Sequence, residues 1–474
     1  MKLNKNPLLI LIFLAVFLFN LYVSLNFNYF FDSTSYFNLR VIEHIASTGL
    51  PLLYDPLGYS GVDLAVPQLF HYLVGIFFFI PFYFKIIPAL FASSIVFVVY
   101  LLSKEVTKNE YASLLTSFLS GFVPIYFIRT VNNVSIYSLM VPLIFWLFYF
   151  LIKIEQKKYL KLFLLFSFLL PFAGASSFLF VFSLIFYVIL NVTENIKIAE
   201  LKKEAILFSF FVVLLINLIL FKKAFFMQGF DVIYGNVPRL ILENYFRSFN
   251  IFNSIYLIGV FSFFFGIVGV YYGLKEKSIS VILFISLILS TLLLLFLKLI
   301  NINVGLLFLA MGLTVISSLA LNKFFIYLNK TKLSNFKNYF MVFFVLLVII
   351  FALLPSYYSS QNVKNLEVFE WMKNNLEEGS VVLAPPGHGH YITSLAEKKN
   401  VMDSNFLLVD DADDRFNSVS IIYNTWSETK ALELLREYKV NYIYVNNMSE
   451  YNLNFLDDEK CFERIREEIY KVKC

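Results

Sequence analysis

The chain has 474 residues, of which 59% are hydrophobic and 15% charged, and its mean hydropathy is +0.73. A soluble protein is typically about half apolar and about a quarter charged, so this composition excludes an ordinary water-soluble domain. The net charge of +5 is spread over the loops, which indicates membrane topology and argues against a nucleic-acid partner.

The apolar residues occur in blocks long enough to cross a bilayer, which takes about 20 residues per helix. The first block follows Lys2 and Lys5. It is longer than the core of a usual signal peptide and lacks a small-residue cleavage site, so we predict a retained first helix. The fold class predicted is a polytopic α-helical membrane protein with about eleven spans, at residues 8–27, 84–103, 111–128, 134–152, 159–172, 174–190, 204–221, 251–273, 279–298, 303–321 and 338–355.

Lysines divide the connecting loops into two sides. They gather after the second, fourth, sixth, eighth and tenth spans, on the side that also holds the N-terminus. Positively charged loops stay inside, so we predict a multi-pass protein of the cell membrane with a cytoplasmic N-terminus and an extracytoplasmic C-terminus. Counting the short apolar segment 70–82 as a span would put the lysines outside. We therefore expect an interfacial or re-entrant helix there.

This topology divides the chain into two domains. Residues 1–355 form a transmembrane domain with long outer loops at 28–82 and 222–250, and residues 356–474 form a small soluble α/β domain outside the membrane. Within the outer domain, hydrophobic patterning predicts helices at 368–376 and 428–438 and strands at 380–384 and 440–445. The two cysteines, Cys461 and Cys474, could pair in an oxidising compartment or remain free thiols.

Asp32 follows the first span directly, at the start of an amphipathic segment that we expect to lie along the membrane as a helix. Apolar residues repeat in this segment at helical spacing, at Tyr36, Leu39, Ile42 and Ile45. A carboxylate near the hydrocarbon edge is costly unless a metal, a cation or a polar substrate partners it. On residue type alone, the commoner role for an aspartate before Ser-Thr-Ser is a helix N-cap.

Three other polar features have simpler interpretations. Asp55 and Asp63 lie among Pro and Gly and are expected to be turn residues. His388 and His390 lie in a Gly/Pro segment, where we expect a solvated loop rather than a metal site. The acidic run Asp410, Asp411, Asp413 and Asp414 lacks the glycine and terminal glutamate of a calcium loop, so we expect a solvated face.

Several of these segments together resemble one enzyme family. Asp32, the Gly49–Pro56 segment (Gly-x-Pro-x-x-Tyr-Asp-Pro), and Arg129-Thr130 at the outer end of a span occur in the order found in GT-C membrane glycosyltransferases. Three further features are similar to the catalytic subunit of archaeal-type oligosaccharyltransferases: residues 370–375 within the predicted helix, Gly389 in the frame of the WWDYG signature, and Asp403-Ser404-Asn405 where the family has an Asp-Asn pair. The resemblance covers both ends of the chain and its topology.

The resemblance implies a sugar donor linked to a polyprenyl phosphate, used on the extracytoplasmic side, with membrane lipids as the other partner. Asp32 would be the catalytic base or a ligand of a divalent cation, Mg²⁺ or Mn²⁺. The substrate-binding residues would be Tyr36, Arg40, Arg129 and Arg239, because cations hold a phosphate leaving group. For Arg129, at a span end, simple snorkelling is an equal alternative.

This sequence departs from the family pattern at several positions, and these departures limit what the resemblance implies for this chain. Only Gly389 remains of WWDYG, so we expect an acceptor other than the standard Asn sequon. Val131-Asn132-Asn133 replace the second acidic motif, and a full carboxylate site for a metal is not evident. The alternative is a non-catalytic relative that binds lipid-linked glycans in envelope assembly. A transporter is a weaker third hypothesis, because charges inside the spans are nearly absent.

Overall fold

The computed structural model describes residues 7–235, 237–247, 249–331, 337–361, 366–409, 411–446 and 451–474. The chain forms two compact units, each built from three segments. Unit 1 comprises Met1–Asn28, Pro67–Leu220 and Tyr245–Gln361, and unit 2 comprises Tyr29–Val66, Phe221–Asn244 and Asn362–Cys474. The predicted domain boundary at residue 355 stays a prediction. Asp410, the first residue of the predicted acidic run, lies outside the described residues.

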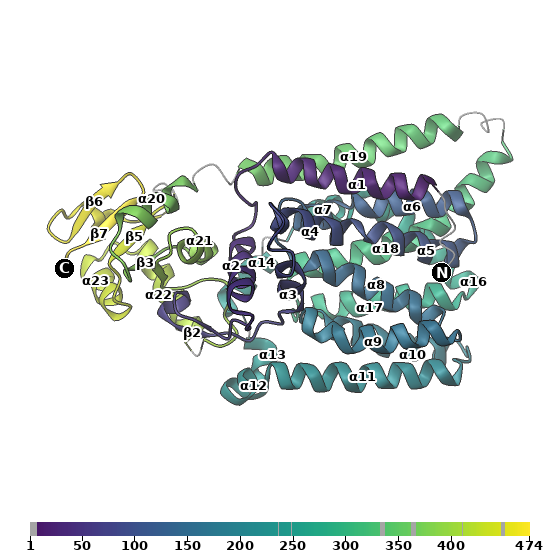
Figure 1. Cartoon of the computed structure of the whole chain (residues 1–474), viewed down its shortest axis with the longest axis horizontal. Coiled ribbons are helices and arrows are strands. Elements are labelled where there is room, and N and C mark those ends of the chain that lie inside the picture. The colour runs from purple at the N-terminus through teal and green to yellow at the C-terminus, as the bar shows by residue number, and fades with distance from the viewer. Residues whose placement is uncertain are drawn as a thin grey trace. The chain divides into compact units, whose positions relative to one another are not determined.

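Unit 1 is helical (Figure 1), and its helices pack against one another, for example α1 against α4 and α19 against α7. Each of the predicted spans overlaps a helix, so the apolar blocks were correctly assigned to helices. The helices are α1 (Pro7–Leu25), α3 (Leu69–Gly75), α4 (Tyr83–Ser93), α5 (Ile95–Thr107), α6 (Glu110–Gly121), α7 (Pro124–Thr130), α8 (Tyr137–Ile152), α9 (Lys157–Ala173), α10 (Ser177–Thr193), α11 (Glu200–Leu220), α15 (Ile251–Ile258), α16 (Val260–Glu276), α17 (Ile279–Phe296), α18 (Ile302–Asn329) and α19 (Lys337–Gln361).

Five helical stretches in the described part of the chain are long and apolar enough to cross a membrane, and two bent helix pairs raise the number to seven. The pairs are α6 with α7, bent by 48°, and α15 with α16, bent by 87°. Three shorter apolar helices, α8, α10 and the Tyr339–Leu354 part of α19, add to these. The number eleven therefore stays a prediction. In the excluded segment 70–82, α3 has 7 residues, too few to cross a bilayer.

Helices α16 and α18 pack closely because glycines on α16 face α18. A Cβ on Gly269 would lie 2.4 Å from the carbonyl oxygen of Ile316, and one on Gly266 would lie 2.8 Å from Leu313 Cβ. Small residues allow helix backbones to approach in this way inside a membrane. The Thr314 hydroxyl also donates to Ser262 Oγ, at 2.9 Å. The two helices therefore form one closely packed pair.

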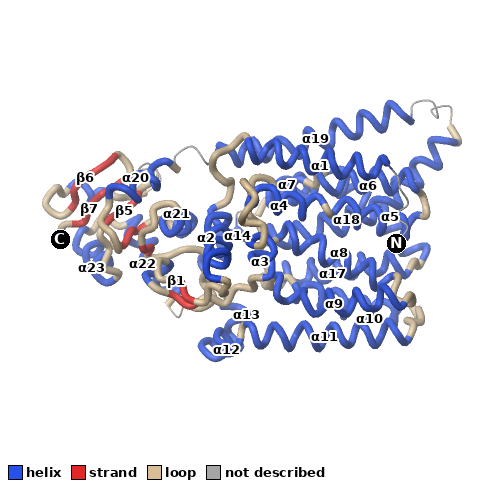
Figure 2. Tube along the Cα trace, viewed as in Figure 1, coloured by secondary structure: helices blue, strands red, loops and turns tan. Residues whose placement is uncertain are grey.

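All strands in the described part of the chain belong to unit 2, as the red segments in Figure 2 show. A five-stranded sheet has the order β4-β3-β5-β7-β6, in which β4, β3 and β5 are parallel and β7 and β6 are antiparallel. A separate two-stranded hairpin pairs β1 with β2. The strands are β1 (Tyr54–Asp55), β2 (Val62–Asp63), β3 (Val381–Leu383), β4 (Lys399–Asn400), β5 (Tyr442–Tyr444), β6 (Phe462–Arg466) and β7 (Ile469–Val472).

The helices of unit 2 come from all three of its segments. The predicted helices at 368–376 and 428–438 correspond to α20 and α23, and the predicted strands correspond to β3 and β5. These predictions are confirmed. The helices are α2 (Ser33–Thr48), α12 (Lys222–Gln228), α13 (Val232–Gly235), α14 (Arg239–Arg247, which begins in this unit), α20 (Glu367–Asn375), α21 (Gly389–Ser394), α22 (Ala412–Asn424) and α23 (Glu428–Glu437), with 3₁₀ turns η1 (Gly58–Ser60), η2 (Gly229–Asp231), η4 (Pro386–His388) and η6 (Asn454–Asp457).

The C-terminal hairpin of β6 and β7 carries both cysteines at its ends. Cys461 and Cys474 are joined by a disulfide, so of the two alternatives the structure has the paired one. The hairpin was missed in the sequence because Glu463, Arg464 and Arg466 make β6 look like a solvated segment.

Candidate functional site

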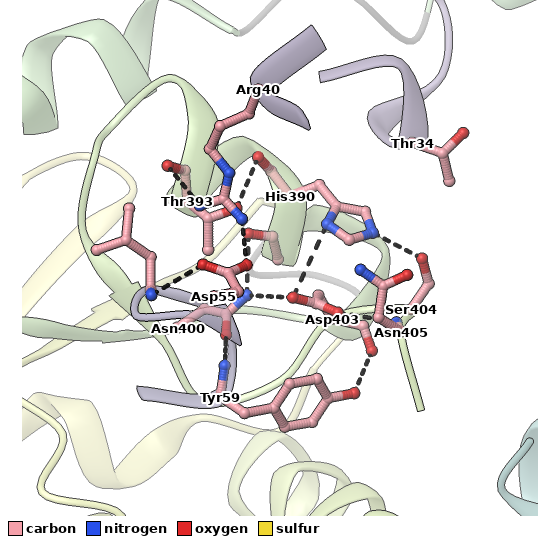
Figure 3. Close-up of polar contacts among 12 residues, drawn as sticks. Thr34, Arg40, Asp55, Tyr59, His390, Thr393, Asn400, Asp403, Ser404 and Asn405 are labelled. Atoms are coloured by element: carbon pink, nitrogen blue, oxygen red, sulfur yellow. Dashed lines mark hydrogen bonds and ion pairs between the residues drawn. The ribbon is translucent and has the colours of Figure 1, made fainter. Parts of the chain in front are cut away.

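Two buried aspartates lie at the centre of unit 2, one from the first outer segment and one from the C-terminal segment. Asp55 and Asp403 are each 1% exposed. A Cβ on Gly58 would lie 2.8 Å from Asp55 Oδ2 and 3.2 Å from Asp403 Oδ2, so both carboxylates border this glycine. Buried carboxylates are costly unless cations or hydrogen-bond donors compensate them. Figure 3 shows the groups that do so.

Arg40 on α2 compensates Asp55. The Arg40 guanidinium forms an ion pair with the Asp55 carboxylate, and its other terminal nitrogen lies 3.5 Å from the carbonyl oxygen of Thr393. The backbone N–H of Leu57 donates to Asp55 Oδ1 at 3.0 Å. Asp55 is therefore the turn residue that was expected, but it is also a buried ion-pair partner, which was not expected. Arg40, predicted to bind substrate, has its guanidinium engaged inside the unit.

Asp403 is held by hydrogen bonds from three sides. Asn400 Nδ2 donates to Asp403 Oδ2 at 3.1 Å, and the backbone N–H of Asn405 donates to Oδ1 at 2.8 Å. The hydroxyl of Tyr59 donates to the carbonyl oxygen of Asp403 at 2.6 Å. Asn400 Oδ1 in turn accepts from the backbone N–H of Tyr59 at 2.6 Å. The η1 turn is thereby attached to β4 and the loop that follows it.

His390 lies against the same carboxylates. Its side chain is buried, with Nε2 2.8 Å from Ser404 Oγ and Nδ1 3.8 Å from Asp403 Oδ2. Burial lowers the pKa of His390 and outweighs Asp403, Asp32 and Asp55, whose charges raise it; Arg40 adds to the lowering. The expectation of a solvated loop was wrong for His390, because α21 turns this side chain into the unit against Phe37.

Asp32, the predicted catalytic residue, is half-buried and caps α2. Its Oδ1 accepts from the backbone N–H of Thr34 at 3.2 Å, so the N-cap alternative is confirmed. Its charge opposes the lowering of the His390 pKa by burial, and it adds to the raising of the Tyr391 pKa, which burial mainly causes. Asp32 therefore lies at the edge of this group of charged residues. We call the group the acid–histidine cluster and define it as Asp32, Asp55, Asp403, His390 and Arg40.

Tyr36, predicted to bind substrate, is a packing residue in this structure. It is 4% exposed, and its hydroxyl accepts from the backbone N–H of Phe30 at 3.0 Å. Its ring packs against Tyr391 of α21 at 5.3 Å between centroids, and burial raises the pKa of its hydroxyl. The apolar side of α2 thus contacts α21, and the expectation that this helix lies along the membrane stays a prediction.

The two other predicted substrate-binding arginines lie in different units. Arg129 is half-buried in the last turn of α7 in unit 1. Arg239 is exposed at the start of α14, where its backbone N–H donates to Asp413 Oδ1 at 2.9 Å. A second contact from the same segment, an ion pair between Lys223 and Asp63, also ties residues 221–244 to the rest of unit 2. Asp413, which was expected only to face solvent, therefore also accepts a hydrogen bond from another segment of the unit.

The residues around Asp32 do not supply a ligand set for the predicted divalent cation. Among the described residues, the single group of three ligands within 4.8 Å of one another is Glu428, Asp458 and Cys461. The sulfur of Cys461 is in the disulfide, and an acidic pair alone is common on surfaces. Asp32 could act only as one protein ligand, with the others coming from substrate or water.

Gly389, the one residue that matches the family's signature, has a packing role. A Cβ there would lie 2.2 Å from the carbonyl oxygen of Met402 and 2.6 Å from Asp403 Cβ. Any larger residue would push α21 away from the loop that carries Asp403. The retention of this glycine is therefore explained by packing of the acid–histidine cluster.

Comparison with protein-family models finds no match, and a search of curated protein sequences finds none either. Solved structures do match. The oligosaccharyltransferase of Archaeoglobus fulgidus in its apo form gives a TM-score of 0.67 at 16% identity, over 94% of this chain and 70% of that chain. The same enzyme, AglB, in complex with an inhibitory peptide and a dolichol-phosphate gives 0.62 at 15% identity, over 91% and 69%.

A second enzyme has the same fold over its whole length. ArnT from Cupriavidus metallidurans, bound to undecaprenyl phosphate, gives a TM-score of 0.59 at 9% identity and is covered over 97% of both chains. At such identities the likeness establishes the fold. Together with the apolar helices, it identifies a multi-pass helical membrane protein with the fold of GT-C membrane glycosyltransferases, resembling the archaeal oligosaccharyltransferase.

Proposed function

We propose that this chain transfers a sugar from a polyprenyl-phosphate-linked donor, on the extracytoplasmic side of the membrane, to an acceptor other than the standard Asn sequon. The observation that carries the proposal is Asp32, a half-buried carboxylate at the edge of the acid–histidine cluster in a GT-C fold. Two of the similar structures hold a dolichol-phosphate and an undecaprenyl phosphate, which supports a lipid phosphate as the donor's carrier.

In this proposal Asp32 is the general base. It takes the proton from the acceptor's nucleophilic atom, which forms a bond to the anomeric carbon of the sugar. The bond between that carbon and the phosphate oxygen breaks, and its electron pair leaves with the phosphate. Arg239, which lies in the same unit as Asp32, is proposed to bind the phosphate by charge-assisted hydrogen bonds, and the role of Arg129, in unit 1, stays a prediction. Since the residues around Asp32 do not form a metal site, no step is assigned to a cation.

The acid–histidine cluster has a positioning role in this proposal. Arg40 is committed to Asp55, and Tyr36 is packed on Tyr391, so neither needs to contact the substrate. Both hold α2 against α21. The N-cap of α2 is Asp32 itself, so the position of the carboxylate depends on this packing.

The acceptor proposed is not a sequon, because the Trp-Trp-Asp part of the family's signature is absent. In its frame stand Pro385, Pro386 and Gly387, and the last two of these belong to the η4 turn. Gly389 is explained by its contact with Met402, so its presence gives no support to sequon recognition.

The test uses Asp32→Asn, because asparagine is as good an N-cap as aspartate but cannot accept the proton. Membranes with the wild-type chain should transfer radiolabelled sugar from a panel of polyprenyl-phosphate donors, and Asp32→Asn should lose at least about a hundredfold of that rate. Asp63→Asn, at a half-exposed aspartate of the same unit, is the matched control and should keep the rate. Equal transfer by wild type, Asp32→Asn and membranes lacking the protein would refute the proposal.

A second candidate function is binding of a lipid-linked glycan without transfer. The observation favouring it is that two asparagines replace the second acidic motif and have structural contacts. The backbone N–H of Asn132 donates to Ser24 Oγ at 3.0 Å, and Asn133 Nδ2 donates to the carbonyl oxygen of Ile128 at 2.9 Å. Retention of a lipid-linked glycan by both wild type and Asp32→Asn, with no transfer by either, would favour this alternative.

A further inference from the structure

A cavity of about 460 Å³ opens between α16 and α18 of unit 1. Its apolar lining includes Phe265 and Val268 of α16 and Phe324 of α18. The rings of Phe265 and Phe324 are 6.3 Å apart. Its polar lining lies near the C-terminal ends of the two helices and includes Tyr272, Lys323, Tyr327 and Lys330. One cavity therefore combines an apolar wall with two lysines and two phenol hydroxyls.

The polar level of the cavity coincides with the ends of both helices. Residues 302–322 of α18 carry no charge, and Lys323 is the first charged residue of that helix. On α16, residues 260–274 carry none, and charges begin at Lys275. An ion pair of 2.7 Å between Lys323 and Glu276 holds the two charged levels side by side.

The length of α18 puts this level at the edge of a bilayer. The helix has 28 residues, which at about 1.5 Å per residue makes it about 42 Å long. The hydrocarbon core is about 30 Å thick, so the last turns of α18 extend to the lipid headgroups. The cavity's outer rim faces away from the core, since the Val268 and Ile326 side chains are 45% and 43% exposed and Tyr327 is 68% exposed.

The charges favour an anionic occupant. Lys323 is offset by Glu276, and its ammonium also lies 5.6 Å from the centroid of the Tyr272 ring. Lys330 then gives the group of three ionised side chains a net charge of +1. A single phosphodiester charge matches this, and the tyrosine hydroxyls can donate to its oxygens. Basic pockets between transmembrane helices at headgroup level bind lipids in this way.

We propose that this cavity is a binding site for one anionic phospholipid, whose phosphate lies between Lys323 and Lys330 and whose acyl chain follows the groove along Phe265, Val268 and Phe324. The apolar wall distinguishes this ligand from a free phosphate, and the net charge distinguishes it from a zwitterionic lipid. The site lies wholly in unit 1 and does not depend on the proposed sugar transfer.

The test is native mass spectrometry of the full chain, released from detergent after addition of phosphatidylglycerol or phosphatidylcholine. We expect one phosphatidylglycerol to stay bound and phosphatidylcholine to be lost. Lys330→Gln should weaken phosphatidylglycerol binding about fivefold, the factor that corresponds to about 1 kcal/mol for one lysine at a membrane surface. Val268→Trp, at a partly exposed groove position, should weaken it by obstructing the acyl chain while leaving every charge in place.

The matched control is Lys203→Gln, which removes an exposed lysine in the first turn of α11, outside the cavity lining. It should leave the affinity unchanged. Equal affinity of wild type, Lys330→Gln and Val268→Trp would overturn the proposal. So would equal retention of the two lipids, displacement of the lipid by millimolar inorganic phosphate, or retention of a polyprenyl phosphate in place of phosphatidylglycerol.

Discussion

The guanidinium of Arg40 and the carboxylate of Asp55 form an ion pair in which the aspartate is 2% and the arginine 19% exposed at the side chain. The pair joins α2 to the β1–β2 hairpin within the first outer segment. Because the carboxylate is buried, removal of the arginine would leave a charge without its cation.

Arg40→Met should therefore lower the free energy of unfolding of unit 2 by about 3–5 kcal/mol, the usual cost of breaking a buried pair from one side. Urea unfolding in detergent, followed by tryptophan fluorescence in a Trp146→Phe background, measures this, because Trp371 and Trp426 lie in unit 2. Lys223→Met breaks the half-exposed pair with Asp63 and should cost at most about 1 kcal/mol. A similar small cost for both variants would contradict the prediction.

Gly389→Ala should prevent correct packing of α21, because the new Cβ would lie 2.2 Å from the carbonyl oxygen of Met402. We expect a loss of about 3 kcal/mol, at the upper end of the usual cost of overpacking a core. Gly387→Ala is the matched control, two residues away, where an added Cβ meets nothing within 4 Å. The same unfolding measurement applies, and equal stability of the two variants would show that the Gly389 contact relaxes easily.

Unit 2 should lose stability as pH falls below about 6.5, the ordinary pKa of histidine in the unfolded chain. The folded-state pKa of His390 is lowered by burial, so below that pH the unfolded chain binds a proton that the folded chain excludes. The slope contributed by this group is at most about 1.4 kcal/mol per pH unit. His390→Gln should reduce the slope between pH 7.5 and 5.5, while an unchanged slope would mean that other groups cause it.

The Cys461–Cys474 disulfide should be present in protein taken directly from cells into a thiol-alkylating agent. Peptide mass spectrometry with and without reduction should recover the two cysteines linked, because disulfides persist mainly in oxidising compartments. Cys461→Ser should lower the stability of unit 2 by about 3 kcal/mol, as expected for a loop of this length. Full alkylation before reduction would argue that the C-terminal segment faces a reducing compartment and against the predicted orientation.

Local patterns in the sequence were sufficient for most helices and for the central strands. The apolar blocks identified the helices of unit 1, and the alternation in residues 440–445 identified β5. The bend of 87° between α15 and α16 could not be read from composition. Gly259 lies at the bend, but the residues on both sides of it are apolar, so the sequence was interpreted as one span. Because a bent helix pair cannot be told from a straight span by composition, the number of spans also stays a prediction.

The site was less accessible to sequence reasoning because its residues are partners over long distances along the chain. Asp55 looked like a turn residue since its neighbours are Pro and Gly, and only the fold brings Arg40 and Asp403 to it. His390 looked solvated for the same reason. The sequence offered one indication of its position, the resemblance of Asp403-Ser404-Asn405 to a family motif. This pointed to the loop that His390 contacts, but not to the contact itself.

The three-segment composition of unit 2 has a consequence for biosynthesis. Tyr59 leaves the ribosome early, yet its backbone N–H and hydroxyl bond to Asn400 and Asp403, which are made more than 300 residues later. Until then the η1 turn of the first outer segment lacks its hydrogen bonds to β4 and to the loop that follows it. Unit 2 therefore completes its fold after every helix of unit 1 has been synthesised, and a chain truncated before β4 would lack the bonds that Tyr59 makes to Asn400 and Asp403.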